Sequence, residues 1–221
     1  MVQTTETSPP APFTEPFDET RLTFDLREGS IWNAQHTRIC LAPADMLAGI
    51  CRGIRARAGT GWRAVLKKCG QSWGRRVAER LDHECQDTLK KRVGELPLEM
   101  YLKYMSAYFS FSGWGTLEMD LALASRRGIV QARLRDSIFA AATTSSEPEA
   151  GEILMADPMI EGLLAAMLSY ISGRELACVQ TACAMRGAEQ SLFLISAPAR
   201  IAPLEARVRA GMSHEEIISL L

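Results

Sequence analysis

The order of two hydrophobic periodicities along the chain constrains its fold more than any other feature of the sequence. Apolar residues recur every three to four positions over residues 43–111 and again over 158–173, whereas they alternate over 116–139 and 174–195. The first spacing places apolar side chains on one face of a helix, and the second places them on one face of a strand. Residues 21–41 alternate more loosely and predict short strands or an extended entry. The whole order predicts an α+β fold, an antiparallel sheet of two hairpins covered on one face by helices.

Four long helices are expected from start and stop signals. The first follows Pro43 and ends at the glycine-containing residues 59–61, and the second runs from Trp62 to Cys85 or beyond. The third covers residues 98–111. The fourth covers residues 158–173, with a proline at its start and a glycine at its end, which is the usual asymmetry of helix termini.

Two glycines, Gly70 and Gly74, lie inside the second predicted helix. Each costs about 1 kcal/mol relative to alanine in a helix interior, so a compensating contact is expected. One candidate is a bound ligand ring against the helix, and the other is the close approach of a second helix without a ligand.

Two hairpins account for the alternating segments. Residues 116–124 and 129–139 form the first, and residues 174–181 and 190–195 form the second around a turn at Cys183–Gly187. Cys178 and Cys183 are an odd number of positions apart, so on one strand their side chains would face opposite ways.

One domain is expected over residues 21–200. Residues 1–20 contain four prolines and no periodic apolar pattern, which predicts a disordered leader. Pro198 and Pro203 are expected to end the sheet, so residues 201–221 are interpreted as a tail with a short terminal helix.

The charge of the chain argues against a nucleic-acid partner. The formal net charge is −1, and binding to phosphates requires a clear basic excess. Between Arg52 and Arg92, however, twelve Lys and Arg residues stand against four Asp and Glu residues. This local excess suits an acidic ligand, an acidic protein or an anionic lipid surface, although an ordinary solvated helix face is the simpler explanation.

Six cysteines occur in a chain that is long and apolar enough to fold without disulfides, and residues 1–20 do not have the pattern of a secretory signal. A reducing, cytoplasmic location is therefore expected, with peripheral association with a membrane left open. No stretch reaches the roughly 20 apolar residues that a membrane-spanning helix needs.

Residues 36–197 resemble the 4-vinyl reductase domain family. The resemblance depends on the order and spacing of four stretches: Leu41–Pro43, Cys69–Gly74, Gly113–Gly115, and Gly162 through Cys183–Gly187 to Phe193. It implies a fold similar to the ligand-binding fold of bacterial sensor domains and vesicle-tethering subunits. It also implies a hydrophobic tetrapyrrole ligand, a precursor of chlorophyll or bacteriochlorophyll. The family pattern has a cysteine where this chain has Ser191, so no metal site is predicted here.

The sequence does not decide between an enzyme and a binding protein. The resemblance implies 4-vinyl reduction, but no glycine-rich dinucleotide-binding motif follows a predicted strand. The prediction is a protein that binds a tetrapyrrole, with a magnesium tetrapyrrole as the candidate cofactor or ligand, and acts as a delivery factor or as an accessory to 4-vinyl reduction. The alternative is a small-molecule sensor or protein-interaction module for another hydrophobic effector. A pathway enzyme and a second copy of the chain, forming a homodimer, are the expected protein partners.

Five residues are the predicted ligand-binding site. Trp73, Tyr108 and Trp114 would supply flat apolar walls, His36 would be the candidate axial ligand, and Cys183 lies in the family motif. Each also has a simpler interpretation. The aromatic residues and Cys183 can be ordinary core residues, and His36 can line a cavity without acting as a ligand.

Overall fold

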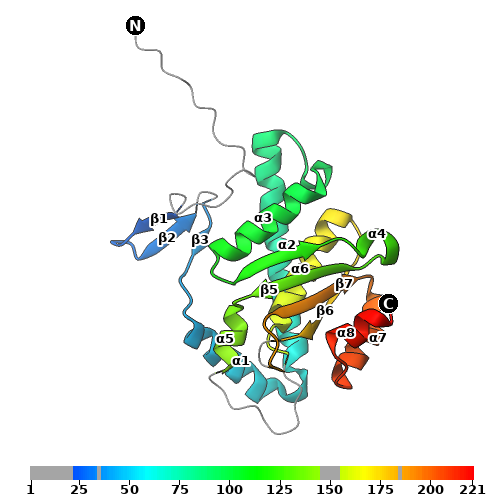
Figure 1. Ribbon diagram of the computed structural model, residues 1–221. Coiled ribbons are helices and arrows are strands. Elements are labelled where there is room, and N and C mark those ends of the chain that lie inside the picture. Colours follow the sequence, from blue (N-terminus) through cyan, green and yellow to red (C-terminus); the bar gives the residue numbers. More distant parts are fainter. Residues whose placement is uncertain (1–21, 34–35, 145–154, 184–185) are drawn as a thin grey trace.

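The computed structural model describes residues 22–33, 36–144, 155–183 and 186–221. It confirms the predicted α+β fold, shown in Figure 1. The predicted leader, residues 1–20, lies outside the described residues. The helices are α1 (Ala44–Ala58), α2 (Trp62–Leu89), α3 (Leu98–Phe111), α4 (Ala124–Arg127), α5 (Ile138–Thr144), α6 (Pro158–Ser172), α7 (Pro198–Arg209) and α8 (His214–Ser219). The strands are β1 (Leu22–Asp25), β2 (Ser30–Asn33), β3 (Arg38–Ile39), β4 (Thr116–Asp120), β5 (Val130–Arg135), β6 (Ala177–Ala182) and β7 (Ser191–Ser196).

The main sheet is antiparallel throughout and has the strand order β4-β5-β7-β6. The two predicted hairpins thus pair through β5 and β7. The strands of the first hairpin are shorter than expected, because the chain turns into α4 after β4 and into α5 after β5. The sequence pattern did not distinguish these two short helices from the neighbouring strands, because a helix of one or two turns shows too little of the helical spacing.

Helices α2, α3 and α6 cover one face of this sheet, as predicted. Large side chains from both layers are almost completely buried between them, among them Tyr101, Phe109, Leu163 and Phe193. A macrocyclic ligand between the layers would therefore have to displace core side chains.

Helices α2 and α6 touch at their backbones. A Cβ atom on Gly70 would lie 2.0 Å from the carbonyl oxygen of Met159, and one on Gly162 would lie 2.0 Å from that of Lys67. At Gly74 the nearest atom, the carbonyl oxygen of Leu163, would be 2.7 Å away. The two glycines of α2 are thus explained by helix packing, which was one of the two sequence interpretations.

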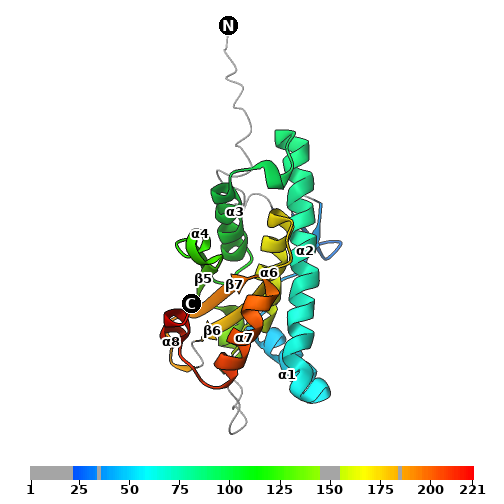
Figure 2. The same cartoon turned by 90° about the vertical axis from the view of Figure 1, so that its right-hand side faces the viewer.

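Helices α7 and α8 pack on the opposite face of the sheet, over β6 and β7 (Figure 2). Their buried residues include Ile201, Leu204 and Ile217, which contact Val179 and Leu194 of the strands. The sequence analysis did not predict α7. Pro198 does not end the ordered structure but starts this helix, and Pro203 lies inside it on the exposed side. The predicted domain boundary at residue 200 falls within α7.

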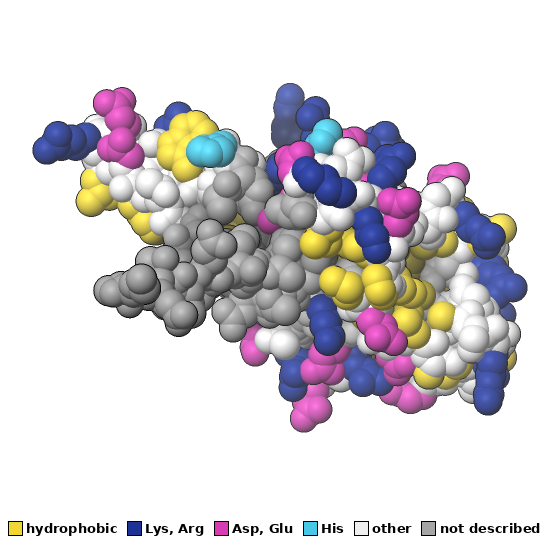
Figure 3. All heavy atoms as spheres, turned by 90° about the horizontal axis from the view of Figure 1, so that it is seen from above, with side chains coloured by type: hydrophobic (Ala, Val, Ile, Leu, Met, Phe, Trp, Pro, Cys, Tyr) yellow, Lys and Arg dark blue, Asp and Glu magenta, His cyan; other side chains and the backbone are white. Residues whose placement is uncertain are grey.

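Strands β1, β2 and β3 form a small separate antiparallel sheet that projects from the main body. Figure 3 shows hydrophobic side chains exposed on it. Phe24 is 53% exposed and Leu26 is 89% exposed. In the described ranges, no helix combines the length and the apolar composition needed to cross a membrane.

Candidate functional site

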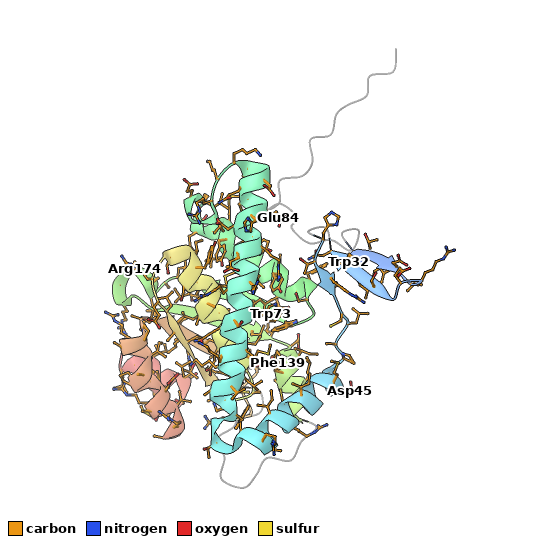
Figure 4. The ribbon with its side chains drawn as sticks, turned by 180° about the vertical axis from the view of Figure 1, so that it is seen from behind. Trp32, Asp45, Trp73, Glu84, Phe139 and Arg174 are labelled. Carbon is orange, nitrogen blue, oxygen red and sulfur yellow. The ribbon has the colours of Figure 1, made fainter. Side chains whose placement is uncertain are left out.

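The candidate site is a cluster of aromatic rings where α2, α3, α5 and the start of β4 meet. The ring centroids of Trp73 and Trp114 lie 4.1 Å apart. Tyr108 meets Trp73 edge-on at 6.1 Å, and the ring of Phe139 meets Trp114 edge-on at 5.2 Å. Figure 4 shows Trp73 on the long helix α2 and Phe139 on α5. The structure therefore brings together three of the five predicted site residues.

The three rings from the sequence prediction are only half-buried, whereas Phe109 and Phe139 beneath them are buried. Trp114 lies on the turn between α3 and β4. Gly115, next to it, has a φ of 119°, a conformation that other residues rarely adopt. Trp73, by contrast, is fixed on α2, whose neighbouring residue Gly74 contacts α6. The site thus has one rigid wall and one wall carried by a turn.

Tyr108 supplies a polar group at the edge of the cluster. Burial raises the pKa of its hydroxyl above the ordinary value, although the positive charge of Arg80 and hydrogen bonds with Ser112 and Arg80 oppose that effect. The hydroxyl therefore stays protonated at neutral pH. An aromatic surface with one phenol and one guanidinium at its edge suits a small ring that bears an oxygen substituent.

The other two predicted residues lie elsewhere. His36 is exposed, in the connection between β2 and β3, with a left-handed backbone conformation at φ 53°. Cys183 is buried against the side chains of α7 and α8, while Cys178 faces the core under α2 and α6. The opposite orientation expected for these two cysteines is confirmed, and it places Cys183 on the other face of the sheet from the aromatic cluster.

Ser191 belongs to a buried hydrogen-bond network around Asp157. Its hydroxyl donates to Asp157 at 2.6 Å, and the side-chain amide of Gln180 donates to Asp157 at 2.7 Å and to Ser191 at 3.0 Å. The hydroxyl of Ser137 also donates to Asp157. Burial raises the pKa of Asp157, and these three donors oppose the rise. Among the described residues, no group of three or more His, Cys, Asp and Glu side chains is arranged to hold a metal ion.

A second, partly buried network ties α2 to the edge of the sheet. Glu161 on α6 accepts hydrogen bonds from Arg63 at 3.1 Å and from the backbone N–H of Gln180 at 3.0 Å. Lys67 lies 3.2 Å from Glu161 and donates to the carbonyl oxygen of Cys178 and to Glu205 on α7, each at 2.7 Å. Gln180 N–H and Cys178 C=O belong to β6, the edge strand, so these side chains satisfy part of that edge.

Ion pairs within the domain account for part of the basic excess counted between Arg52 and Arg92. Arg63, Lys67 and Arg92 all pair with carboxylates of the domain itself. An open groove of about 1010 Å³ runs beside α2 and α6. It is lined by further basic residues, namely Lys68, Arg75, Arg76 and Arg174. Two acidic residues, Glu79 and Glu175, line it as well, so the groove has a mixed charge.

A smaller hollow of about 440 Å³ opens between the β6–β7 turn and α8. Thr181 and His214 meet there, with 2.7 Å between the hydroxyl oxygen and Nδ1. Burial lowers the pKa of His214, so its ring is predominantly neutral at neutral pH. The predicted short terminal helix is present as α8, and Ser213 and Glu216 form a capping box at its start.

Comparisons with solved structures show the fold. The phenol-responsive sensory domain of the transcription activator PoxR, solved with phenol, is similar over 86% of this chain and 92% of its own, with 18% identity and a TM-score of 0.64. A trafficking protein particle complex subunit 3 from Naegleria fowleri, covalently bound to palmitic acid, is similar over 69% and 93%, with 13% identity and a TM-score of 0.52. The predicted likeness to sensor domains and vesicle-tethering subunits is therefore confirmed at the level of the fold.

A vinyl-4-reductase family protein from Methanocaldococcus jannaschii is also among the similar structures. It covers 59% of this chain and 66% of its own, with 16% identity and a TM-score of 0.40. A likeness of this extent does not assign the chain to that family. No family model matches the sequence, and the comparison with curated proteins gave no match.

Sequence reasoning missed the two polar networks. A signal was present, because Gln180 and Ser191 interrupt otherwise apolar strands at buried positions. Their common partner, Asp157, is the residue directly before α6. Since 23 and 34 positions separate Asp157 from these two residues, local patterns do not link them.

Proposed function

We propose that this chain is a small-molecule-binding domain whose ligand is a small aromatic compound with an oxygen substituent. The observation that carries the proposal is the contact of Trp73 with Trp114. One ring is held on a rigid helix and the other on a turn, and both remain partly exposed above a buried aromatic floor. A ring-sized guest inserts by moving the turn rather than a helix.

The polar groups at the edge of the aromatic cluster indicate which polar substituent the ligand should carry. Tyr108 offers a hydroxyl, and Arg80 a charged donor, within an apolar surround. These groups already bond to each other, so a phenolic oxygen or a carboxylate of the ligand would join an existing hydrogen-bonded group while the ring stacks against the tryptophans. Phenol is a suitable first probe, because the sensory domain of PoxR, which has a similar fold, was solved with it. A domain of this kind would act by passing its bound state to a partner protein.

A tetrapyrrole is the second candidate ligand, with a role in pigment delivery or as an accessory to 4-vinyl reduction. One observation favours it. Trp73 and Trp114 come from two separate stretches of the 4-vinyl reductase resemblance, and they meet in the fold. The predicted axial ligand His36 lies in the β2–β3 connection of the small sheet, so this candidate would have to use another group or none.

Intrinsic tryptophan emission tests the proposal. Titration with phenol, benzoate and magnesium protoporphyrin is expected to give saturable quenching with one of the two simple aromatics. Replacement of Trp114 by Leu is expected to weaken that binding by at least about tenfold, which corresponds to about 1.4 kcal/mol. The matched control is Trp32→Phe. Trp32 lies on the small sheet (Figure 4), so this substitution is expected to leave binding unchanged.

The outcomes separate the two candidates. Saturable binding of the porphyrin alone, with a red-shifted absorption band, supports the tetrapyrrole and rejects the small aromatic ligand. Consumption of NADPH in the presence of a vinyl-bearing tetrapyrrole would show that the protein also catalyses reduction of this ligand. If neither class quenches the emission in a saturable way, the aromatic cluster is only a core feature.

A further inference from the structure

His214, the first residue of α8, lies between two hollows on the face of the main sheet opposite the aromatic cluster. One is the hollow of about 440 Å³ beside the β6–β7 turn. The other, the His214 hollow, has a volume of about 300 Å³ and opens between α8 and the strands β5 and β7. Gln190 and Leu192 also line both hollows, so the two meet at the histidine ring.

The hydrogen bonds of Thr181 determine which ring nitrogen of His214 carries the proton. The hydroxyl oxygen of Thr181 lies 2.7 Å from Nδ1 of His214, and the hydroxyl donates to the carbonyl oxygen of Leu192 at 3.3 Å. A hydroxyl has a single proton to donate, and a carbonyl oxygen can only accept. Both contacts are therefore hydrogen bonds only if Nδ1 carries the ring proton and donates it to Thr181. The neutral ring then has its lone pair on Nε2.

This second nitrogen, Nε2, is left for a bound molecule. Among the residues that the structure describes, none forms a hydrogen bond with it. Burial lowers the pKa of His214; the carboxylate of Glu215 opposes this effect, and the positive charge of Arg133 adds to it. The ring is therefore predominantly neutral at neutral pH, and it offers a hydrogen-bond acceptor to the hollow rather than a positive charge.

Arg133 on β5 supplies the positive charge of the His214 hollow. Ala132 and Leu134 are buried in the core, so the alternation of the strand directs the side chains of Gln131 and Arg133 to the opposite face of the sheet. One guanidinium nitrogen of Arg133 lies 3.3 Å from the carboxylate of Asp120 on β4. A guanidinium has five N–H donors, so others remain for a ligand.

We propose that the His214 hollow binds a small carboxylic acid that carries a hydroxyl or amino group close to its carboxylate. The carboxylate pairs with the guanidinium of Arg133, whose planar donors match its two oxygens. The neighbouring O–H or N–H group donates to Nε2 of His214, and the side-chain amides of Gln131 and Gln190 line the hollow beside them. A volume of about 300 Å³ suits a ligand of this size.

Nuclear magnetic resonance of protein labelled with ¹⁵N in its histidines tests the acceptor. The chain has three histidines, and the variant His214→Asn identifies which signals belong to His214. At neutral pH these signals are expected to show a neutral ring with its proton on Nδ1. The exposed ring of His36 is the internal reference. A neutral His214 ring with its proton on Nε2 overturns the proposal, because it has no acceptor to offer.

The same signals measure binding. Lactate, a hydroxy acid, and alanine, an amino acid, are the two probes, and at least one of them is expected to shift the Nε2 signal of His214 in a saturable way. The probe that does so identifies the class of the ligand. Propionate has the carboxylate but no donor beside it, so it is expected to bind at least about tenfold more weakly.

Substitutions on β5 test the role of the guanidinium. Arg133→Gln is expected to raise the dissociation constant of the probe at least about tenfold. The matched control is Arg135→Gln, since Arg135 lies two positions further along the same face of the strand, pairs with Glu118 and does not line the hollow. Both arginines are exposed, and circular dichroism checks that both variants are folded.

Three binding results overturn the proposal. The first is that neither lactate nor alanine gives a saturable shift. The second is that propionate binds as tightly as they do, since the donor on the ligand then contributes nothing. The third is an equal effect of Arg133→Gln and Arg135→Gln. Trp114→Leu is expected to leave this binding unchanged, so the His214 hollow and the aromatic cluster are tested independently.

Discussion

The ammonium of Lys67 lies 3.2 Å from the carboxylate of Glu161, in a position where the two side chains together close the edge of the main sheet. The ammonium of Lys67 donates a hydrogen bond to the carbonyl oxygen of Cys178, and the carboxylate of Glu161 accepts one from the N–H of Gln180. Burial by itself would lower the pKa of Lys67, but the carboxylates of Glu161 and Glu205 outweigh it and hold that pKa above its ordinary value. The lysine is therefore charged throughout the physiological range.

Replacement of Lys67 by Met is expected to destabilise the domain by about 3–5 kcal/mol, because Glu161 keeps a buried charge with one partner fewer. The free energy of unfolding in urea measures the effect. The neighbouring substitution Lys68→Met is the control, since Lys68 is exposed, and it is expected to change stability by less than about 0.5 kcal/mol. Equal effects at the two positions would contradict a structural role for the Lys67 network.

Alanine at Gly70 or Gly162 is expected to destabilise the domain, although alanine normally favours a helix by about 1 kcal/mol over glycine. The new methyl group would lie 2.0 Å from a backbone carbonyl oxygen, so the two helices would have to separate. Gly53→Ala, at an open position of α1, is the matched control. This substitution is expected to be neutral or stabilising. Stabilisation at all three positions would mean that the backbones of α2 and α6 do not touch.

The buried carboxylate of Asp82 predicts a pH dependence of stability. Burial would raise its pKa, but hydrogen bonds from the N–H of Val93 and from Arg92 and Tyr170 outweigh burial and hold the pKa below its ordinary value of 3.8. A carboxyl whose pKa is lower in the folded state stabilises the fold above the unfolded pKa. That contribution is lost as the pH falls through the folded value.

Asp82→Asn is therefore expected to cost about 1–3 kcal/mol at pH 7, and less as the pH falls below about 4. Urea unfolding of both proteins at several pH values measures the difference. A penalty that stays the same at pH 7 and pH 3 would show that the charge of Asp82 contributes nothing.

A chain that ends at residue 200 is expected to lose most of its stability. It lacks most of α7 and all of α8, and so exposes Val179 and Leu194 on the second face of the sheet. Leu204→Ala is a milder test and is expected to cost about 2–5 kcal/mol. Thermal unfolding followed by circular dichroism checks both. Unchanged stability of the shortened chain would support the predicted domain boundary and the interpretation of residues 201–221 as a tail.

The parts of the fold that sequence reasoning predicted are those with a long, uniform period. Helices α2, α3 and α6 each show several turns of apolar spacing, and β6 and β7 alternate or run apolar between clear turn residues. Helix α7 was missed because Pro203 was interpreted as a stop signal. The spacing of Ile201, Leu204 and Val208 did carry the helical signal. Pro203 is tolerated on the exposed side of the helix.

The candidate site was predictable only in part. Trp73, Tyr108 and Trp114 were selected for their ring chemistry, and the packing of α2 against the turn before β4 brings them together. His36 and Cys183 were selected by residue type and motif, which do not specify which side of the sheet or which sheet a side chain occupies. The Asp157 network depends on contacts between residues far apart in sequence and has no local signature.

The glycine contacts between α2 and α6 determine how this domain can respond to a bound molecule. Where two backbones touch, neither helix can rotate or slide without moving the other, so the pair moves as one rigid body. Deformation on binding must then be concentrated in the connecting turns, and the residues flanking Trp114 are the place where a change of shape should first be detected.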